Sequence, residues 1–176
     1  MPVAELRLRI STPTEPIPPG RGFYQLEEDS LYVQLGLFSA RRHFYSFLEN
    51  DLLRLDLDKT GRLIFFEISL PRRRWPVDET LAAPTVIEPA DIRWLEFRDR
   101  IPETTLLTNK KRTLLRVGLS DRTPVRNYYL AKEVLLQVDE LDRAVAFWVT
   151  DIIDDLAGQE IGAFRKKNRS NNSFFG

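Results

Sequence analysis

The chain has no cysteine and a single histidine among its 176 residues. The absence of cysteine excludes disulfides, a thiolate nucleophile, iron–sulfur clusters and zinc sites built on sulfur. No stretch approaches the roughly 20 apolar residues that a membrane-spanning helix needs, and the first ten residues lack the apolar segment of a signal peptide. The sequence therefore predicts a cytoplasmic protein held together by packing, with no membrane partner. A secreted form cut from a precursor stays open.

The chain also lacks an excess of charge of either sign. Its 26 basic and 26 acidic residues cancel, so no overall field favours nucleic acid over any other partner. The eight glycines are scattered, and Gly20-Arg21-Gly22 lies in a proline-rich stretch instead of between a strand and a helix. No phosphate-binding glycine loop is visible, and we expect no cofactor.

Alternating apolar and polar residues dominate what is present. Leu53 to Leu57 alternates, residues 58–62 supply turn chemistry, and Leu63 to Ile68 is a β-branched and aromatic run. This pattern predicts a β-hairpin over 53–69 that turns at Lys59-Thr60-Gly61. Weaker strand patterns occur at residues 3–10, 31–35, 44–48, 92–98, 104–107 and 113–119.

The segment 134–150 has two interpretations. Aligned with 53–69 without gaps, it repeats Leu55 as Leu136, Asp58 as Asp139, Arg62 as Arg143 and Phe66 as Phe147. Against this, its apolar residues also fall at steps of three and four, and Gly158 suits a helix C-cap, which indicates one long helix near 131–157. We favour strands, because residues 144–149 are rich in β-favouring types and Phe147 would lie on the polar face of that helix. A short helix over 151–157 fits either interpretation.

The predicted fold is mainly β, with two related β-meander or hairpin halves packed as one compact body and at most a short C-terminal helix. An α+β fold with the long helix is the alternative. The predicted segments are an N-terminal strand and proline-rich connector (1–22), a first meander (23–70), a proline- and arginine-rich linker (71–89), a second β-rich unit (90–163) and a basic polar tail (164–176). Composition alone predicts disorder in the tail, and docking on its own domain or on a neighbouring chain is the other possibility.

Two segments carry a resemblance to known proteins. They are Tyr24 to Val33 and Leu55 to Ile68, and together they resemble a family of small uncharacterised bacterial proteins with the pattern Y-D-x-E-x-D-x-L-Y-I followed by V-D-x-D-x-x-G-R-x-x-G-I-E-I. This chain departs from the pattern at Gln25, where the family favours an acid, and at Phe65, where it favours glycine. The resemblance implies a small β-meander with no assigned activity and no established functional residues.

The hairpin also carries the spacing of a calcium loop. Positions 1, 3, 5, 6 and 12 of the EF-hand pattern are held by Asp56, Asp58, Thr60, Gly61 and Glu67. Thr60 replaces an acidic or amide ligand, position 9 is the apolar Ile64, and Pro71 blocks the helix that an EF-hand needs. We therefore interpret these residues as the polar part of a hairpin loop and predict no metal site.

No catalytic residues are predicted. His43 has no carboxylate near it in sequence, and the chain has no Gly-x-Ser-x-Gly elbow and no second histidine. We interpret His43 as a solvated or hydrogen-bonded side chain.

Basic clusters are the main positive feature. Arg72, Arg73 and Arg74 precede Trp75, and such a group can clamp phosphates and stack a base. Further clusters are Arg41-Arg42, Lys110-Lys111-Arg112 and Lys166-Lys167-Asn168-Arg169. The alternative is that all of them are solvated turn and linker charges.

Three functional hypotheses follow. The first is a non-enzymatic domain that binds a protein partner or assembles with itself through aromatic and arginine side chains or an unpaired sheet edge. Its candidate aromatics are Trp75, Trp94, Trp148 and Phe174-Phe175, which core packing also explains. The second is a nucleic-acid-binding regulator that uses the basic clusters. The third is an enzyme whose carboxylates, such as Asp56, Asp58 and Asp139, meet only in the fold.

Overall fold

A computed structural model describes residues 3–37 and 43–169 of the chain. The described part is mainly β, with the 3-10 turn η1(Arg72–Arg74) and one helix, α1(Gln159–Lys167), near the C-terminus. This confirms the predicted fold class. The alternative of a long helix near 131–157 is wrong, because that region consists of strands and the turns between them.

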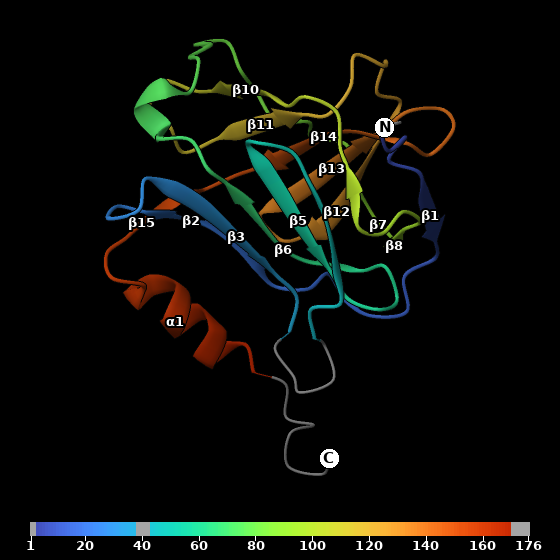
Figure 1. Cartoon of the computed structure of the whole chain (residues 1–176), viewed down its shortest axis with the longest axis horizontal. Helices are drawn as coiled ribbons and strands as arrows, with labels where there is room; N and C mark the ends of the chain where they lie inside the picture. Colours follow the sequence, from blue (N-terminus) through green and yellow to red (C-terminus); the bar gives the residue numbers. More distant parts are fainter. Residues whose placement is uncertain (1–2, 38–42, 170–176) are drawn as a thin grey trace.

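The strands form two large sheets and a separate two-stranded ribbon (Figure 1). Sheet 1 has the order β15(Ile153–Asp155), β2(Gly20–Gln25), β3(Ser30–Leu35), β6(Leu63–Ile68), β5(Leu53–Leu57), β4(Ser46–Glu49), β9(Asp99–Arg100). Sheet 2 has the order β10(Thr105–Thr108), β11(Leu115–Gly118), β14(Ala144–Val149), β13(Val134–Val138), β12(Arg126–Ala131), β7(Glu88–Pro89). The ribbon pairs β1(Leu8–Ser11) with β8(Asp91–Trp94).

The predicted hairpin over 53–69 is confirmed as β5 and β6, which pair antiparallel. Asp58 holds its turn together, since its Oδ1 accepts hydrogen bonds from the backbone N–H groups of Thr60 (2.9 Å) and Arg62 (3.0 Å). Gly61 has a φ of 86°, a left-handed conformation that glycine adopts without a steric penalty. The turn therefore follows from its aspartate and its glycine.

Strands β13 and β14 form a second hairpin with the same register. Leu55 opposite Phe66 in the first hairpin becomes Leu136 opposite Phe147 in the second, 81 residues later. The turn is built in the same way, because Asp139 Oδ1 accepts hydrogen bonds from the N–H groups of Leu141 and Arg143, both at 2.9 Å. The prediction of strands over 134–149 is thus confirmed.

The correspondence extends across both sheets. The order β2-β3-β6-β5-β4 in sheet 1 matches β10-β11-β14-β13-β12 in sheet 2. Val33 lies opposite Phe66 as Val117 lies opposite Phe147. Each sheet also gains a parallel partner from the other half of the chain. In sheet 1, β15 pairs parallel with β2, and in sheet 2, Val77 forms a parallel bridge to Thr108 on β10. The two sheets are alike in strand order and register, while an origin by duplication of the sequence stays a prediction.

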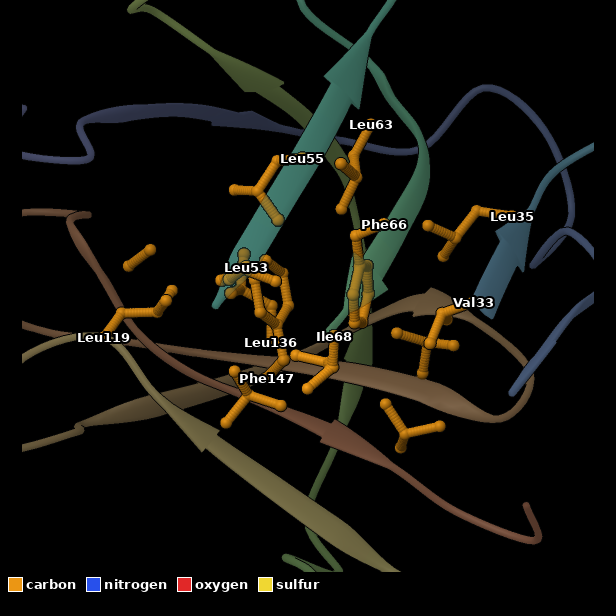
Figure 2. Close-up of a cluster of buried hydrophobic side chains, with 14 of the residues drawn as sticks. Val33, Leu35, Leu53, Leu55, Leu63, Phe66, Ile68, Leu119, Leu136 and Phe147 are labelled. Atoms are coloured by element: carbon orange, nitrogen blue, oxygen red, sulfur yellow. The ribbon is translucent and has the colours of Figure 1, made fainter. Parts of the chain in front are cut away.

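The core lies between the inner faces of the sheets. Phe66 and Phe147 stack there with ring centroids 4.8 Å apart and an interplanar angle of 22°. Trp94 from the ribbon packs against Phe147 at 5.9 Å and closes one side. Figure 2 shows Leu55 and Ile68 of sheet 1 pointing into the same space as Phe147 and Leu136 of sheet 2. All six of these residues are buried in one cluster.

The C-terminal part differs from the prediction. A helix over 151–157 is wrong, because residues 153–155 pair with β2 as β15, and the helix starts only at Gln159. Asp155 explains this start, since its carboxylate accepts hydrogen bonds from the N–H groups of Glu160 (2.8 Å) and Ile161 (3.2 Å). Free N–H groups of a first helical turn favour such an acceptor.

The first residues of the predicted tail belong to α1 and dock on their own domain. The ring of Phe164 packs edge-on against Phe23 at 5.3 Å, and Arg165 Nε donates to Gln34 Oε1 at 2.9 Å. Phe174-Phe175 lie outside the described residues. Among the helices that the structure describes, none combines the length and apolar character needed to cross a membrane.

We expect Phe66→Ala and Phe147→Ala to destabilise the protein by similar amounts, about 3–5 kcal/mol each, because each leaves a cavity at the same contact. Chemical denaturation of both variants and of the double variant measures this. The double variant should lose less than the sum, since the two rings share one contact. Val86→Ala, at an exposed position, is the matched control and should change stability little. Additive losses would contradict the central role of the stack.

Asp139 gives the protein a predictable pH dependence. Burial acts to raise the pKa of this carboxyl, but hydrogen bonds from Arg143 and Leu141 and the charge of Arg143 outweigh burial and hold the pKa below its usual value. A lowered pKa in the folded state stabilises the protein above the unfolded pKa of about 3.9, and this contribution disappears as pH falls through the folded value. Asp139→Asn should therefore cost about 1.5–3 kcal/mol at pH 7 and progressively less below about pH 4.

Denaturation at pH 7 and pH 3 tests this difference. Asp142→Asn is the control, because Asp142 lies in the same turn and its carboxylate forms an exposed ion pair with Arg126. A stability difference for Asp139→Asn that is equal at both pH values would show that the carboxylate charge is irrelevant.

Candidate interaction surfaces

The structure places the residues of the calcium-like spacing in two separate environments. Asp58 is buried in the turn, and Thr60 Oγ1 donates to Asp58 Oδ1 (2.7 Å) and accepts from Arg93. Asp56 and Glu67 instead lie on the outer face of sheet 1, where Arg54 Nε is 2.9 Å from Asp56 Oδ1 and Arg54 lies opposite Glu67 in the strand register. Within residues 3–37 and 43–169, no group of three or more acidic or histidine side chains is arranged to hold a metal ion.

The outer-face carboxylates repel each other. Burial raises the pKa of Glu67, and the negative charges of Glu28 and Asp56 raise it further against the opposing charge of Arg54. The carboxylates proposed for an enzyme do not share a site either, since Asp58 and Asp139 each cap the turn of a different hairpin.

His43 is exposed in the segment before β4. A small pocket of about 80 Å³, partly open to solvent, lies under the proline-rich connector. Its charged lining is already paired, because Arg62 lies 3.8 Å from a Glu15 oxygen and 3.7 Å from an Asp91 oxygen. The hydrogen bond from Arg93 and the charges of Arg93 and Arg62 hold the pKa of Asp91 below its usual value, so this carboxyl is not set up to donate a proton.

The arginine–tryptophan cluster is divided between interior and surface. Trp75 is 2% exposed, its Nε1 donates to Leu70 O at 3.0 Å, and its ring packs against Tyr24. Arg72 forms an ion pair with Asp154, and its guanidinium lies 4.5 Å from the centre of the Tyr24 ring. Trp75 therefore cannot stack a base, and Arg72 serves to join η1 to β2 and β15.

Two of the predicted basic clusters come together at one end of the molecule. Arg112 Nε donates to the backbone oxygen of Arg72 at 3.0 Å, which brings the loop between β10 and β11 against η1. The exposed cations of this end are Arg73, Arg74, Lys110 and Lys111, which we call the basic surface. Lys166, Lys167 and Arg169 lie at the end of α1, and Arg41-Arg42 are outside the described residues.

A second surface consists of aromatic side chains around β4, which we call the aromatic face: Phe44, Tyr45, Phe47, Phe65 and Phe97. Phe44 and Tyr45 are 51% and 60% exposed. Phe44 stacks on Phe47 at 6.5 Å, and Tyr45 packs edge-on against Phe97 at 6.1 Å. The guanidinium of Arg54 lies over Phe47 at 4.5 Å and over Phe44 at 5.6 Å, so cation–π contacts order this face.

The aromatic face borders a hollow of about 380 Å³ between β3, β6 and α1. Phe65 forms part of its wall together with Ile64, Leu37 and Arg165. Phe65 also packs against Tyr32 at 5.5 Å. The uncovered part of the outer face of sheet 1 therefore runs from α1 to the segment before β4.

The three tryptophans among the predicted interface aromatics are core residues, since Trp75, Trp94 and Trp148 are at most 5% exposed. Sequence reasoning did not identify Phe44, Tyr45 or Phe97. One signal was available, because alternation in the predicted strand 44–48 turns Tyr45 and Phe47 to the same side, so the three aromatics Phe44, Tyr45 and Phe47 cannot all face the core.

Neither a protein-family model nor a curated protein matches the chain. The resemblance to uncharacterised bacterial proteins therefore stays a prediction.

We expect Asp58→Ala to destabilise the protein by about 2 kcal/mol, because it leaves the N–H groups of Thr60 and Arg62 without their acceptor. Thermal denaturation with and without millimolar Ca²⁺ separates a turn cap from a metal ligand. A cap predicts the same loss in both conditions and no effect of Ca²⁺ on the wild type. A rise in the wild-type Tm on adding Ca²⁺, abolished by Asp58→Ala, would instead establish a metal site.

Proposed function

We propose that the chain is a non-enzymatic, self-associating β domain, and that the aromatic face is its contact surface. The observation that carries this proposal is the group of exposed aromatic rings ordered by Arg54. Aromatic and arginine side chains dominate the binding energy of protein interfaces. Exposed apolar patches of this kind commonly mark interaction sites.

The aromatic face is held rigidly, which favours binding. Tyr45 N donates to Leu57 O at 2.8 Å, and β4 pairs with β5 along its whole length. The rings contact each other as well as Arg54. A surface that is already ordered loses little conformational entropy on association.

The outer face of sheet 2, unlike that of sheet 1, is covered by another segment of the same chain. In sheet 2, the positions of Arg54 and Glu67 are taken by Leu135 and Trp148, which are 3% and 5% exposed. The chain between Val77 on the β10 side and β7 on the β12 side runs across that sheet, and Asn127 Nδ2 donates to Val86 O at 3.1 Å. Polypeptide thus covers the apolar outer face of sheet 2, whereas the corresponding part of sheet 1 is charged and leaves the aromatic face beside it available to another chain.

A second copy of the chain is the partner that the charges favour. The aromatic face carries both signs, with Arg54 beside Asp56 and with Arg98 and Asp99 nearby on the hollow next to Phe47. A two-fold dimer places each patch on its own counterpart, so mixed charge allows opposite signs to meet. The zero net charge of the chain leaves no long-range repulsion between copies.

Light scattering and sedimentation velocity across a concentration series test this proposal. The wild type should approach twice the 20.5 kDa chain mass as concentration rises. The double variant Phe44→Ser, Tyr45→Ser should stay at the chain mass, with association weakened at least about tenfold, because two anchors of 1–2 kcal/mol each are removed.

The matched control is Val125→Ser with Leu141→Ser, which removes two exposed apolar side chains elsewhere and should leave the mass unchanged. A wild type that is monomeric at all concentrations would overturn the proposal. So would an equal loss of association in both double variants.

A further inference from the structure

We propose that the basic surface binds the phosphate backbone of nucleic acid without regard to base sequence. This binding is independent of self-association, since the basic surface and the aromatic face share no residues. Arg73, Arg74, Lys110 and Lys111 are exposed, and neither η1 nor residues 109–112 contain an acidic residue. Four cations on two neighbouring loops form a local positive field on a chain with no net charge.

The two loops are held at a fixed spacing. Arg112 Nε bonds to Arg72 O, and Thr108 N donates to Pro76 O while Asp78 N donates to Thr108 O, both at 2.9 Å. Within the second loop, Asn109 Oδ1 accepts from Thr113 N at 2.9 Å. Because the backbones are ordered before binding, only the four side chains need to be immobilised by a ligand.

The nearby acids do not cancel this field. Asp154 is paired with Arg72, which is not one of the four exposed cations. Asp29 lies 3.4 Å from Arg73, but both side chains are largely exposed, and such a pair is weak and screened by salt. Asp78 remains negatively charged, since its carboxylate accepts hydrogen bonds only from the neutral donors Thr80 N and Oγ1, but the six cations of η1 and residues 110–112 outnumber Asp29, Asp78 and Asp154.

The chemistry of the surface favours phosphates over bases or an acidic peptide. Trp75 is buried, so no aromatic ring of this cluster is free to stack a base. The four exposed side chains are all cationic, and they provide no apolar anchor of the kind a protein partner needs. Backbone phosphates need only cations, and the energy comes from counterion release.

Fluorescence anisotropy with a labelled duplex DNA and a labelled single-stranded RNA, each in two unrelated sequences, tests the proposal from about 50 to 200 mM salt. We expect binding at low salt, similar affinities for the two sequences, and a logarithmic salt slope of about −3 on duplex DNA for three to four phosphate contacts. Lys110→Glu with Lys111→Glu should weaken binding at least about tenfold and lower the slope.

The matched control is Lys166→Glu with Lys167→Glu, the same change of charge at another adjacent lysine pair, on α1. It should weaken binding less than about threefold, since only long-range charge is altered. All four positions are exposed, so both double variants should stay folded, with a small loss of stability where Lys166→Glu and Lys167→Glu place acids at the C-terminal end of α1. No binding at 50 mM salt, equal losses in both variants, or tighter binding of a polyglutamate peptide than of either nucleic acid would overturn the proposal. The double variant Phe44→Ser, Tyr45→Ser separates nucleic-acid binding from self-association, because it should still bind the labelled DNA and RNA.

Discussion

The contact between Phe66 and Phe147 is the constraint on which the rest of the structure depends. The two rings occupy the same register position in sheets of the same strand order, and they stack at 4.8 Å. Rings at equivalent positions can meet only where the inner faces of the two sheets are opposed. Their contact therefore fixes how sheet 1 faces sheet 2, and the aliphatic residues around them pack in layers set by that arrangement.

The opposed sheets also determine where the connecting segments run. Each sheet is completed by chain from beyond its own central strands: β15 and β9 join sheet 1, while Val77 and β7 join sheet 2. The connection through residues 77–88 covers the outer face of sheet 2, and α1 covers only the β2 and β3 side of sheet 1. The aromatic face is what this unequal covering leaves open.

Local patterns predicted the parts of the fold that local physics decides. The two hairpins follow from alternation and from an aspartate that caps the turn, and Phe147 favoured strand over helix because a helix would have exposed it. The short strands β7, β9 and β15 have two or three residues each, and they exist only because a neighbouring edge accepts them. Helix α1 was missed because its sequence is polar, and it depends on Asp155 at its start and on Phe23 beneath it.

The candidate surfaces likewise depend on contacts between residues that are distant in sequence, which local patterns do not predict. Arg72 and Trp75 are close in sequence, but both pack against Tyr24 and are therefore not part of the exposed basic surface. The hydrogen bond from Arg112 to Arg72, 40 residues away in sequence, instead brings Lys110 and Lys111 next to Arg73 and Arg74. The zero net charge of the chain gave no indication of the basic surface. Asp58 and Asp139 are buried in turns, so they count in the total charge but contribute little to the surface potential. A chain that is neutral overall can present a cationic end, because four exposed cations gather on two adjacent segments while Asp58 and Asp139 lie in the turns of the two hairpins.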